Sequence, residues 1–161
     1  MIKIDIISVG KLKEKFFAEA SKEYLKRLQS FCEINIIEVT EYKCCNYPNQ
    51  SQIQKTIDEE GKSILKKIYP KSFKIALCIE GHLKSSEQLA KNFSELISTG
   101  GKNYFTFIIG GSYGLSEQIK QYSDFKLSMS QLTFPHQLSR VILLEQIYRI
   151  FTIQMGKTYH K

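Results

Sequence analysis

The sequence predicts an α/β protein with an open, mainly parallel sheet and helices on both faces. Short apolar runs with the period of a strand alternate along the chain with amphipathic stretches that have the period of a helix. Helices between consecutive strands force those strands to pair in parallel, through crossovers that cover the faces of the sheet. No repeat or linker divides the 161 residues, so we expect a single domain over residues 1–161.

Two strands and two helices are expected in the first half of the chain. An apolar run at Ile2–Val9 predicts the first strand. A helix is expected next, because apolar residues recur at steps of four: Leu12, Phe16, Ala20, Tyr24 and Leu28. The second strand is predicted at Cys32–Val39. A turn-rich stretch, Thr40–Asn49, then leads to a helix at about Gln52–Ile68, which should stop before Pro70.

The second half continues the alternation with shorter elements. A third strand is predicted at Phe73–Gly81. The elements after it are a helix that Ser85 or Ser86 caps and that ends near Ser98, a strand at Tyr104–Gly111, a short helix at Ser116–Tyr122, a strand at Phe125–Met129 and a helix from Pro135 to about Met155. Proline can open the last helix, and Gly156 can end it.

Charge and cysteine content narrow the classes of function. The formal net charge of +7 favours a polyanionic partner such as RNA, although a merely solvated basic surface would look the same. The four cysteines show neither CxxC spacing nor a nearby histidine pair, so no metal site is expected and the thiols should be reduced. No stretch has the length of a membrane span or the pattern of a signal peptide, which predicts a cytoplasmic protein.

The stretch "FTFIIGGSYGL", Phe105–Leu115, is typical of a strand that runs into a ligand-binding loop. It lacks the lysine of a phosphate-binding P-loop and the spacing of a dinucleotide fingerprint. Its glycines would still let the main chain approach a ligand closely, whereas the alternative is a tight turn without a ligand. Ligands of open α/β sheets bind beyond the carboxyl ends of the strands, so the expected site is formed by the loops after Ile79, Ile109 and Met129.

Five segments carry the most distinctive residues, in the order "GKLKEK", "IEG", "FIIGGSYGL", "SQLTFPHQLSRVILLEQIYRIF" and a terminal "YHK". Together they closely resemble the RlmH family, small SPOUT-class methyltransferases that methylate N3 of a pseudouridine in 23S ribosomal RNA. The resemblance covers essentially the whole chain. Its most specific part is "TFPHQ" followed by an apolar helix that contains Arg140, Glu145, Gln146 and Arg149.

The resemblance implies a C-terminal trefoil knot that binds S-adenosyl-L-methionine. The residues that match the family's cofactor pocket are Leu77, Gly110, Met129, Ser130, Gln131, Leu132, Thr133 and Phe134. These residue types suit a cofactor without phosphate, which needs an apolar slot for adenine and backbone groups for its polar edge. Without the resemblance, Leu77, Leu132 and Phe134 would be interpreted as packing residues.

Methylation at N3 requires loss of a proton, so a general base or groups that stabilise the anion are expected. The candidates are His136, Arg140, Tyr159 and His160. His136 and Arg140 are four residues apart and should share the helix face directed at the cofactor loop, although His136 could instead bond to backbone and Arg140 could bind phosphate. The resemblance places the tail with Tyr159 and His160 at the active site, reaching the partner subunit's pocket.

The last helix is apolar on nearly every side, which indicates burial against more than one surface, and a homodimer would explain this. The resemblance also implies a homodimer that acts on 23S ribosomal RNA within the ribosome. Two alternatives remain at this stage. One is a non-catalytic, basic RNA-binding factor in ribosome assembly, and the other is a SPOUT methyltransferase that acts on transfer RNA.

Overall fold

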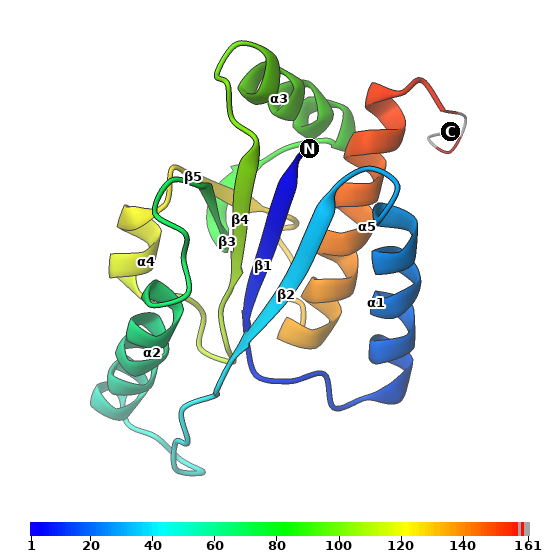
Figure 1. Ribbon diagram of the computed structural model, residues 1–161. Coiled ribbons are helices and arrows are strands. Elements are labelled where there is room, and N and C mark those ends of the chain that lie inside the picture. The colour runs from blue at the N-terminus through cyan, green and yellow to red at the C-terminus, as the bar shows by residue number, and fades with distance from the viewer. Residues whose placement is uncertain (158, 160–161) are drawn as a thin grey trace.

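The computed structural model describes residues 1–157 and residue 159. Five strands form one sheet: β1 (Lys3–Val9), β2 (Glu33–Val39), β3 (Phe73–Leu83), β4 (Tyr104–Ile109) and β5 (Phe125–Ser128). They lie in the order β2-β1-β4-β3-β5, and every neighbouring pair is parallel (Figure 1). The predicted α/β fold with a parallel sheet is therefore confirmed.

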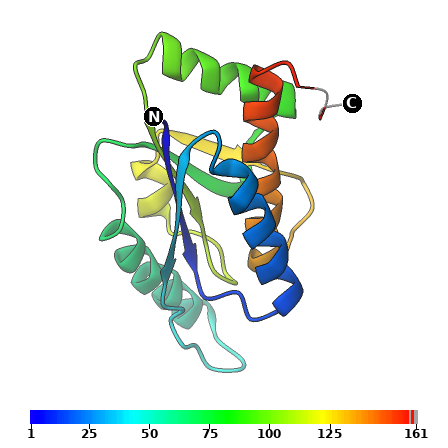
Figure 2. The same cartoon turned by 45° about the vertical axis from the view of Figure 1, so that its right-hand side comes forward.

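Helices cover both faces of this sheet, as expected from the crossovers. They are α1 (Lys15–Leu28), α2 (Gln50–Leu65), α3 (Ser86–Ser98), α4 (Glu117–Tyr122) and α5 (His136–Gln154). Helices α1, α3 and α5 pack on one face, and α2 and α4 pack on the other (Figures 1 and 2).

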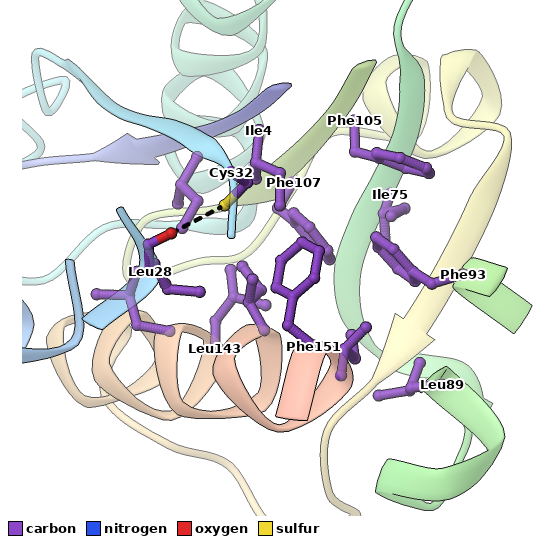
Figure 3. Packing of buried hydrophobic residues seen from close by; sticks show 14 of the residues in the cluster. Ile4, Leu28, Cys32, Ile75, Leu89, Phe93, Phe105, Phe107, Leu143 and Phe151 are labelled. Carbon is purple, nitrogen blue, oxygen red and sulfur yellow. Dashed lines mark hydrogen bonds between the residues drawn. The ribbon is translucent and has the colours of Figure 1, made fainter. Parts of the chain in front are cut away.

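The inner strands β1 and β4 are buried on both faces, and their alternate residues enter two separate cores. Ile4 and Ile6 point toward α1, α3 and α5, whereas Ile7 and Val9 point toward α2 and α4. Figure 3 shows the larger core, in which residues of α3 and α5 close over β4 and β3. There the Phe93 ring stacks on Phe105, with centroids 4.5 Å apart.

Helix α5 lies between α1 and α3, with its buried residues against the sheet. This position accounts for a helix that is apolar on nearly every side within one chain. The pattern that suggested a homodimer therefore does not by itself require a second subunit.

Several predicted boundaries were wrong, and local contacts explain them. Helix α1 begins at Lys15, so Leu12 lies outside it, and Phe16 is 61% exposed rather than inward. The backbone N–H groups of Lys13 and Glu14 instead donate to Gln137 Oε1, at 2.8 and 3.4 Å, which fixes this segment against α5.

Helix α2 begins two residues earlier than predicted, because Asn49 and Gln52 form a reciprocal capping box. Of the two serines predicted to cap α3, Ser85 is the N-cap, and it forms the same kind of box with Gln88. Helix α2 also ends earlier than predicted, at Leu65.

Within the described residues, no helix combines the length and apolar character needed to cross a bilayer. The four cysteines are free. Cys32 is buried, which raises the pKa of its thiol to about 12, and its Sγ donates weakly to the Leu28 carbonyl oxygen (Figure 3). No group of three or more histidine, cysteine or acidic residues in the described part of the chain is placed to hold a metal ion.

Candidate functional site

Two of the three loops that the sequence singles out, after Ile109 and Met129, follow the ends of β4 and β5. The loop predicted after Ile79 is wrong, because β3 continues to Leu83. Leu77 of β3 pairs with Ile109 of β4 on one side and with Leu127 of β5 on the other. Gly110 directly follows Ile109, and Met129 comes two residues after Leu127. Of the eight residues predicted to bind the cofactor, seven therefore follow the carboxyl ends of β4 and β5, where α/β folds bind ligands, and Leu77 lies between those two ends on β3. Their contact with a cofactor stays a prediction.

Strand β3 is interrupted beside this edge. Leu77 and His82 both pair with Leu127, so the segment Cys78–Gly81 bulges out of the ladder. Strand β3 then continues to Leu83, two residues beyond its predicted end. Glycine is required at position 81, because a Cβ there would lie 2.7 Å from the Leu127 carbonyl carbon.

The loop after β4 folds back on itself. Gly111 and Gly114 form an isolated antiparallel bridge, and Gly114 adopts a φ of 87°. A Cβ on Gly110 would lie 2.6 Å from the Gly114 carbonyl oxygen, and one on Gly111 would lie 2.8 Å from Glu60 Oε2. Both glycines thus allow close approach of protein atoms, a requirement that the sequence interpretation had attributed to a ligand.

The segment from Met129 to Phe134 presents several side chains to the surroundings. Met129, Ser130 and Phe134 are half-buried, whereas Gln131, Leu132 and Thr133 are exposed. Its turn is held by Ser130, whose backbone oxygen accepts from Ser128 Oγ at 3.0 Å and whose Oγ accepts from the Leu132 N–H at 3.0 Å. Leu132, which is 72% exposed, is an apolar side chain free to cover a ligand or a partner surface.

Helix α5 brings His136 and Arg140 against the end of β1. His136 Nε2 would be 3.7 Å from a Cβ placed on Gly10. Arg140 is only 1% exposed, and its Nη1 donates to Glu38 Oε1 at 2.7 Å while its Nη2 donates to the Gly10 carbonyl oxygen at 3.0 Å. The buried guanidinium is turned toward the ends of β1 and β2, beside the same Gly10 that His136 borders. A role for Arg140 at the cofactor loop stays a prediction.

Tyr159 lies against α5 of its own chain. Its hydroxyl donates to Glu145 Oε2 at 3.0 Å, and its ring meets the Tyr148 ring edge-on. Burial first, and then the Glu145 carboxylate, raise the pKa of the Tyr159 hydroxyl. Glu145, which binds Tyr159, is about 13 Å along α5 from His136, at about 1.5 Å per residue. Within one chain, Tyr159 and His136 are therefore not close together. His160 lies outside the described residues.

Two cavities border this end of the molecule. One, of about 400 Å³, is apolar and lies between α3, α5 and the sheet, with Ser128 and Met129 at its edge. The other, of about 580 Å³, has a mixed lining that includes Gly10, Lys43, Glu60, Ser112 and Tyr113. Sequence reasoning assigned no role to the second cavity. The sequence did contain an indication of this cavity. Thr56, Glu60 and Ile64 recur at steps of four on one face of α2, and Glu60 is a charged residue on this buried face.

Comparison with known proteins agrees with this geometry. A family model described as a predicted SPOUT methyltransferase matches residues 2–160. A ribosomal RNA large subunit methyltransferase H from Bacillus pumilus (strain SAFR-032) is 48% identical over 158 residues, covering 98% of this chain and 99% of that protein. A Methanococcus maripaludis (strain C5 / ATCC BAA-1333) protein, provisionally given the same name, is 51% identical over the same share of each chain.

Proposed function

This chain belongs to the SPOUT methyltransferase family, and from that premise we propose that it transfers a methyl group from S-adenosyl-L-methionine to N3 of a pseudouridine in 23S ribosomal RNA. The proposal rests on sequence similarity over nearly the full length of the chain. Both relatives, which are named for ribosomal RNA methylation, align with 98% of this chain and with 99% of their own length. We further propose that the enzyme is a one-domain, cytoplasmic homodimer that acts on the large subunit within the ribosome and needs no metal.

Leu77 of β3 and the residues that follow β4 and β5 fit the proposed cofactor. Leu77, Met129 and Leu132 offer apolar side chains, and the turn of Ser130 and the loop from Gly110 offer backbone groups. An adenine ring needs the first kind of surface, and its polar edge needs the second. When bound, the cofactor supplies an electrophilic methyl group.

Residues of this chain would hold the nucleotide and handle its proton. His136 is the described candidate best placed for this, since it lies beside Gly10 and is separated from the 129–134 segment only by Pro135. Arg140 would act through position, because it holds the Gly10 carbonyl and the end of β2 in place. Tyr159 and His160 would act from the partner subunit, a role consistent with Tyr159 lying on α5, far from its own chain's His136.

Labelled methyl transfer to intact ribosomes, free 23S RNA and transfer RNA, measured in parallel, tests the proposed function. We expect ribosomes to be the best substrate. We also expect the protein to bind S-adenosyl-L-methionine at equilibrium in the absence of RNA. A protein that binds RNA but not the cofactor would be the non-catalytic assembly factor. Transfer to transfer RNA alone would favour the other alternative.

Substitution of Gly110 tests the cofactor loop. The Cβ of Gly110→Ala would collide with the Gly114 backbone and displace the loop, so we expect S-adenosyl-L-methionine affinity to fall about tenfold or more, equivalent to about 1.4 kcal/mol. Gly101→Ala is the matched control, because Gly101 has a φ of 61° but no atom within 4 Å of its Cβ position. Calorimetric titration should show an unchanged affinity for the control, and unchanged affinity for Gly110→Ala would remove this loop from the site.

A further inference from the structure

The mixed cavity lies on the other side of β4 from the proposed cofactor site. Gly10 at the end of β1, Val39 at the end of β2 and Ser112 after β4 contribute to its wall. Ser112 and Tyr113 belong to the same loop as Gly110, and His136 borders Gly10. A ligand in this cavity would therefore be adjacent to the cofactor loop and to the proposed proton-handling histidine.

Glu60 forms part of the cavity wall and has an unused acceptor. It is 3% exposed, and its Oε1 accepts the Tyr42 N–H at 3.1 Å, while its buried Oε2 has no hydrogen-bond partner among the residues that the structure describes. Burial raises the pKa of this carboxyl, the Tyr42 N–H lowers it, and the neighbouring Glu41 carboxylate raises it. Buried polar atoms are usually paired, so an unpaired carboxylate oxygen beside a cavity suggests a ligand with a donor.

Several other lining residues suit a nucleotide, although Glu38 and Glu41 also line the cavity. Lys11, Lys13 and Lys43 can contact phosphate, and Tyr113 presents a partly exposed ring on which a base can stack. Oε2 of Glu60 faces Gly111, so a small shift of the glycine loop would expose it to a base lying against Tyr113.

Building on the proposed function, we infer that this cavity receives the target nucleotide and that Glu60 accepts the N1–H of pseudouridine. When N3 is directed at the cofactor's methyl group, N1–H is the hydrogen-bond donor that remains on the pseudouridine ring. Uridine lacks it, because its N1 forms the glycosidic bond. Glu60 would therefore let the enzyme distinguish pseudouridine from uridine, since a site built to pair a donor disfavours the analogue without one.

The test compares ribosomes that carry pseudouridine at the target with ribosomes that carry uridine there, using wild type, Glu60→Gln and Glu59→Gln. The amide of Glu60→Gln can keep its oxygen on the Tyr42 N–H only by turning its NH₂ group toward N1–H. We expect kcat/KM on pseudouridine ribosomes to fall about 10- to 100-fold, as for loss of a hydrogen bond to a charged group, with little change on uridine ribosomes. The control Glu59 is paired with Lys62 on the same helix, outside the cavity lining, and should match wild type.

Thermal unfolding separates this effect from misfolding. Because the pKa of Glu60 is raised on folding, its contribution to stability is full below about pH 4 and is lost as the pH rises through the folded-state pKa. At neutral pH, Glu60→Gln should therefore raise Tm while it lowers activity, and the difference in Tm should shrink toward acidic pH. If Glu60 is a functional acceptor, its replacement should raise Tm and lower activity. If Glu60 were merely structural, its replacement would lower both Tm and activity.

Tyr113→Ala tests the cavity independently of Glu60. We expect KM for ribosomes to rise about tenfold with unchanged affinity for S-adenosyl-L-methionine, because stacking on an aromatic ring contributes about 1–3 kcal/mol per base. Tyr47→Ala is the control, as Tyr47 is 96% exposed and outside the cavity lining. An unchanged KM for Tyr113→Ala would reject the cavity as the nucleotide site. The role of Glu60 would be rejected if Glu60→Gln lost kcat/KM equally on both kinds of ribosome, or if the wild type did not prefer pseudouridine ribosomes. A wild type inactive on both would instead count against the proposed function.

Discussion

Deletion of residues 157–161 is expected to lower methyl transfer by at least about a hundredfold, the lower end of what proton transfer by a positioned side chain contributes. The deleted segment contains Tyr159, whose hydroxyl can hydrogen-bond a substrate, and His160, whose imidazole can accept or donate a proton near neutral pH. Residues 158, 160 and 161 lie outside the described part of the chain. Affinity for S-adenosyl-L-methionine should change little, because the proposed cofactor residues all precede α5.

The fold should survive this deletion. Tyr159 lies against the outer side of α5, where it contacts Glu145, Tyr148 and Arg149, and it also interacts with Tyr24 of α1. The buried residues of α5 end at Thr152. His160→Ala should reproduce much of the loss of activity. The matched control is His82→Ala, since His82 is exposed and its ring stacks on Phe125. Full activity of the deleted protein in single-turnover assays would remove the tail from the mechanism.

Mixed dimers decide whether the tail acts on its own pocket or on the partner's. One subunit carries the tail deletion and the other carries Gly110→Val, whose branched side chain should disable the cofactor loop. If the tail acts on the partner's pocket, the tail-deleted subunit keeps a sound pocket and receives the other subunit's tail, so one site per dimer remains active. If the tail acts within its own subunit, the mixed dimer should be inactive.

The sequence was sufficient to predict every strand and helix and the parallel sheet, because strand and helix periods alternate clearly along it. Of the loops predicted after Ile79, Ile109 and Met129, the last two flank Leu77, because β3 lies between β4 and β5. The first was wrong, because β3 continues past Ile79 to Leu83. The comparisons confirm the family resemblance. The trefoil knot follows from family membership and not from any local pattern, since a knot is a property of how the whole chain is threaded.

Contacts between distant residues set the limits of prediction. Periodicity extended the first helix to Leu12, but Gln137, far along the chain, holds Lys13 and Glu14 in another conformation. Spacing placed Arg140 on the same face as His136, but its direction is fixed by Glu38, 102 residues away. Glu60 was overlooked for a similar reason, because only the folded chain shows that its Oε2 is buried beside a cavity.

Arg140→Ala is expected to reduce the free energy of unfolding by on the order of 3 kcal/mol. The substitution leaves the Glu38 carboxylate and the Gly10 carbonyl oxygen without their donor and opens a space beneath α5. This loss in the free energy of unfolding should be at the low end of the range for breaking a buried ion pair. The Glu38 side chain is one-third exposed, so water can replace the lost guanidinium. Denaturant unfolding at neutral pH measures the change.

Arg140→Met decides between a structural and a catalytic role for this residue. Methionine fills much of the arginine's volume without placing a charge in the protein interior, and buried ion pairs are often replaced by apolar residues at little cost. We therefore expect Arg140→Met to be more stable than Arg140→Ala and, as a folded protein, to keep kcat within about tenfold of wild type. A folded Arg140→Met protein that binds S-adenosyl-L-methionine normally but has lost kcat a hundredfold would show that the guanidinium leaves Glu38 to act on the substrate. The positioning role argued from its buried contacts would then be rejected.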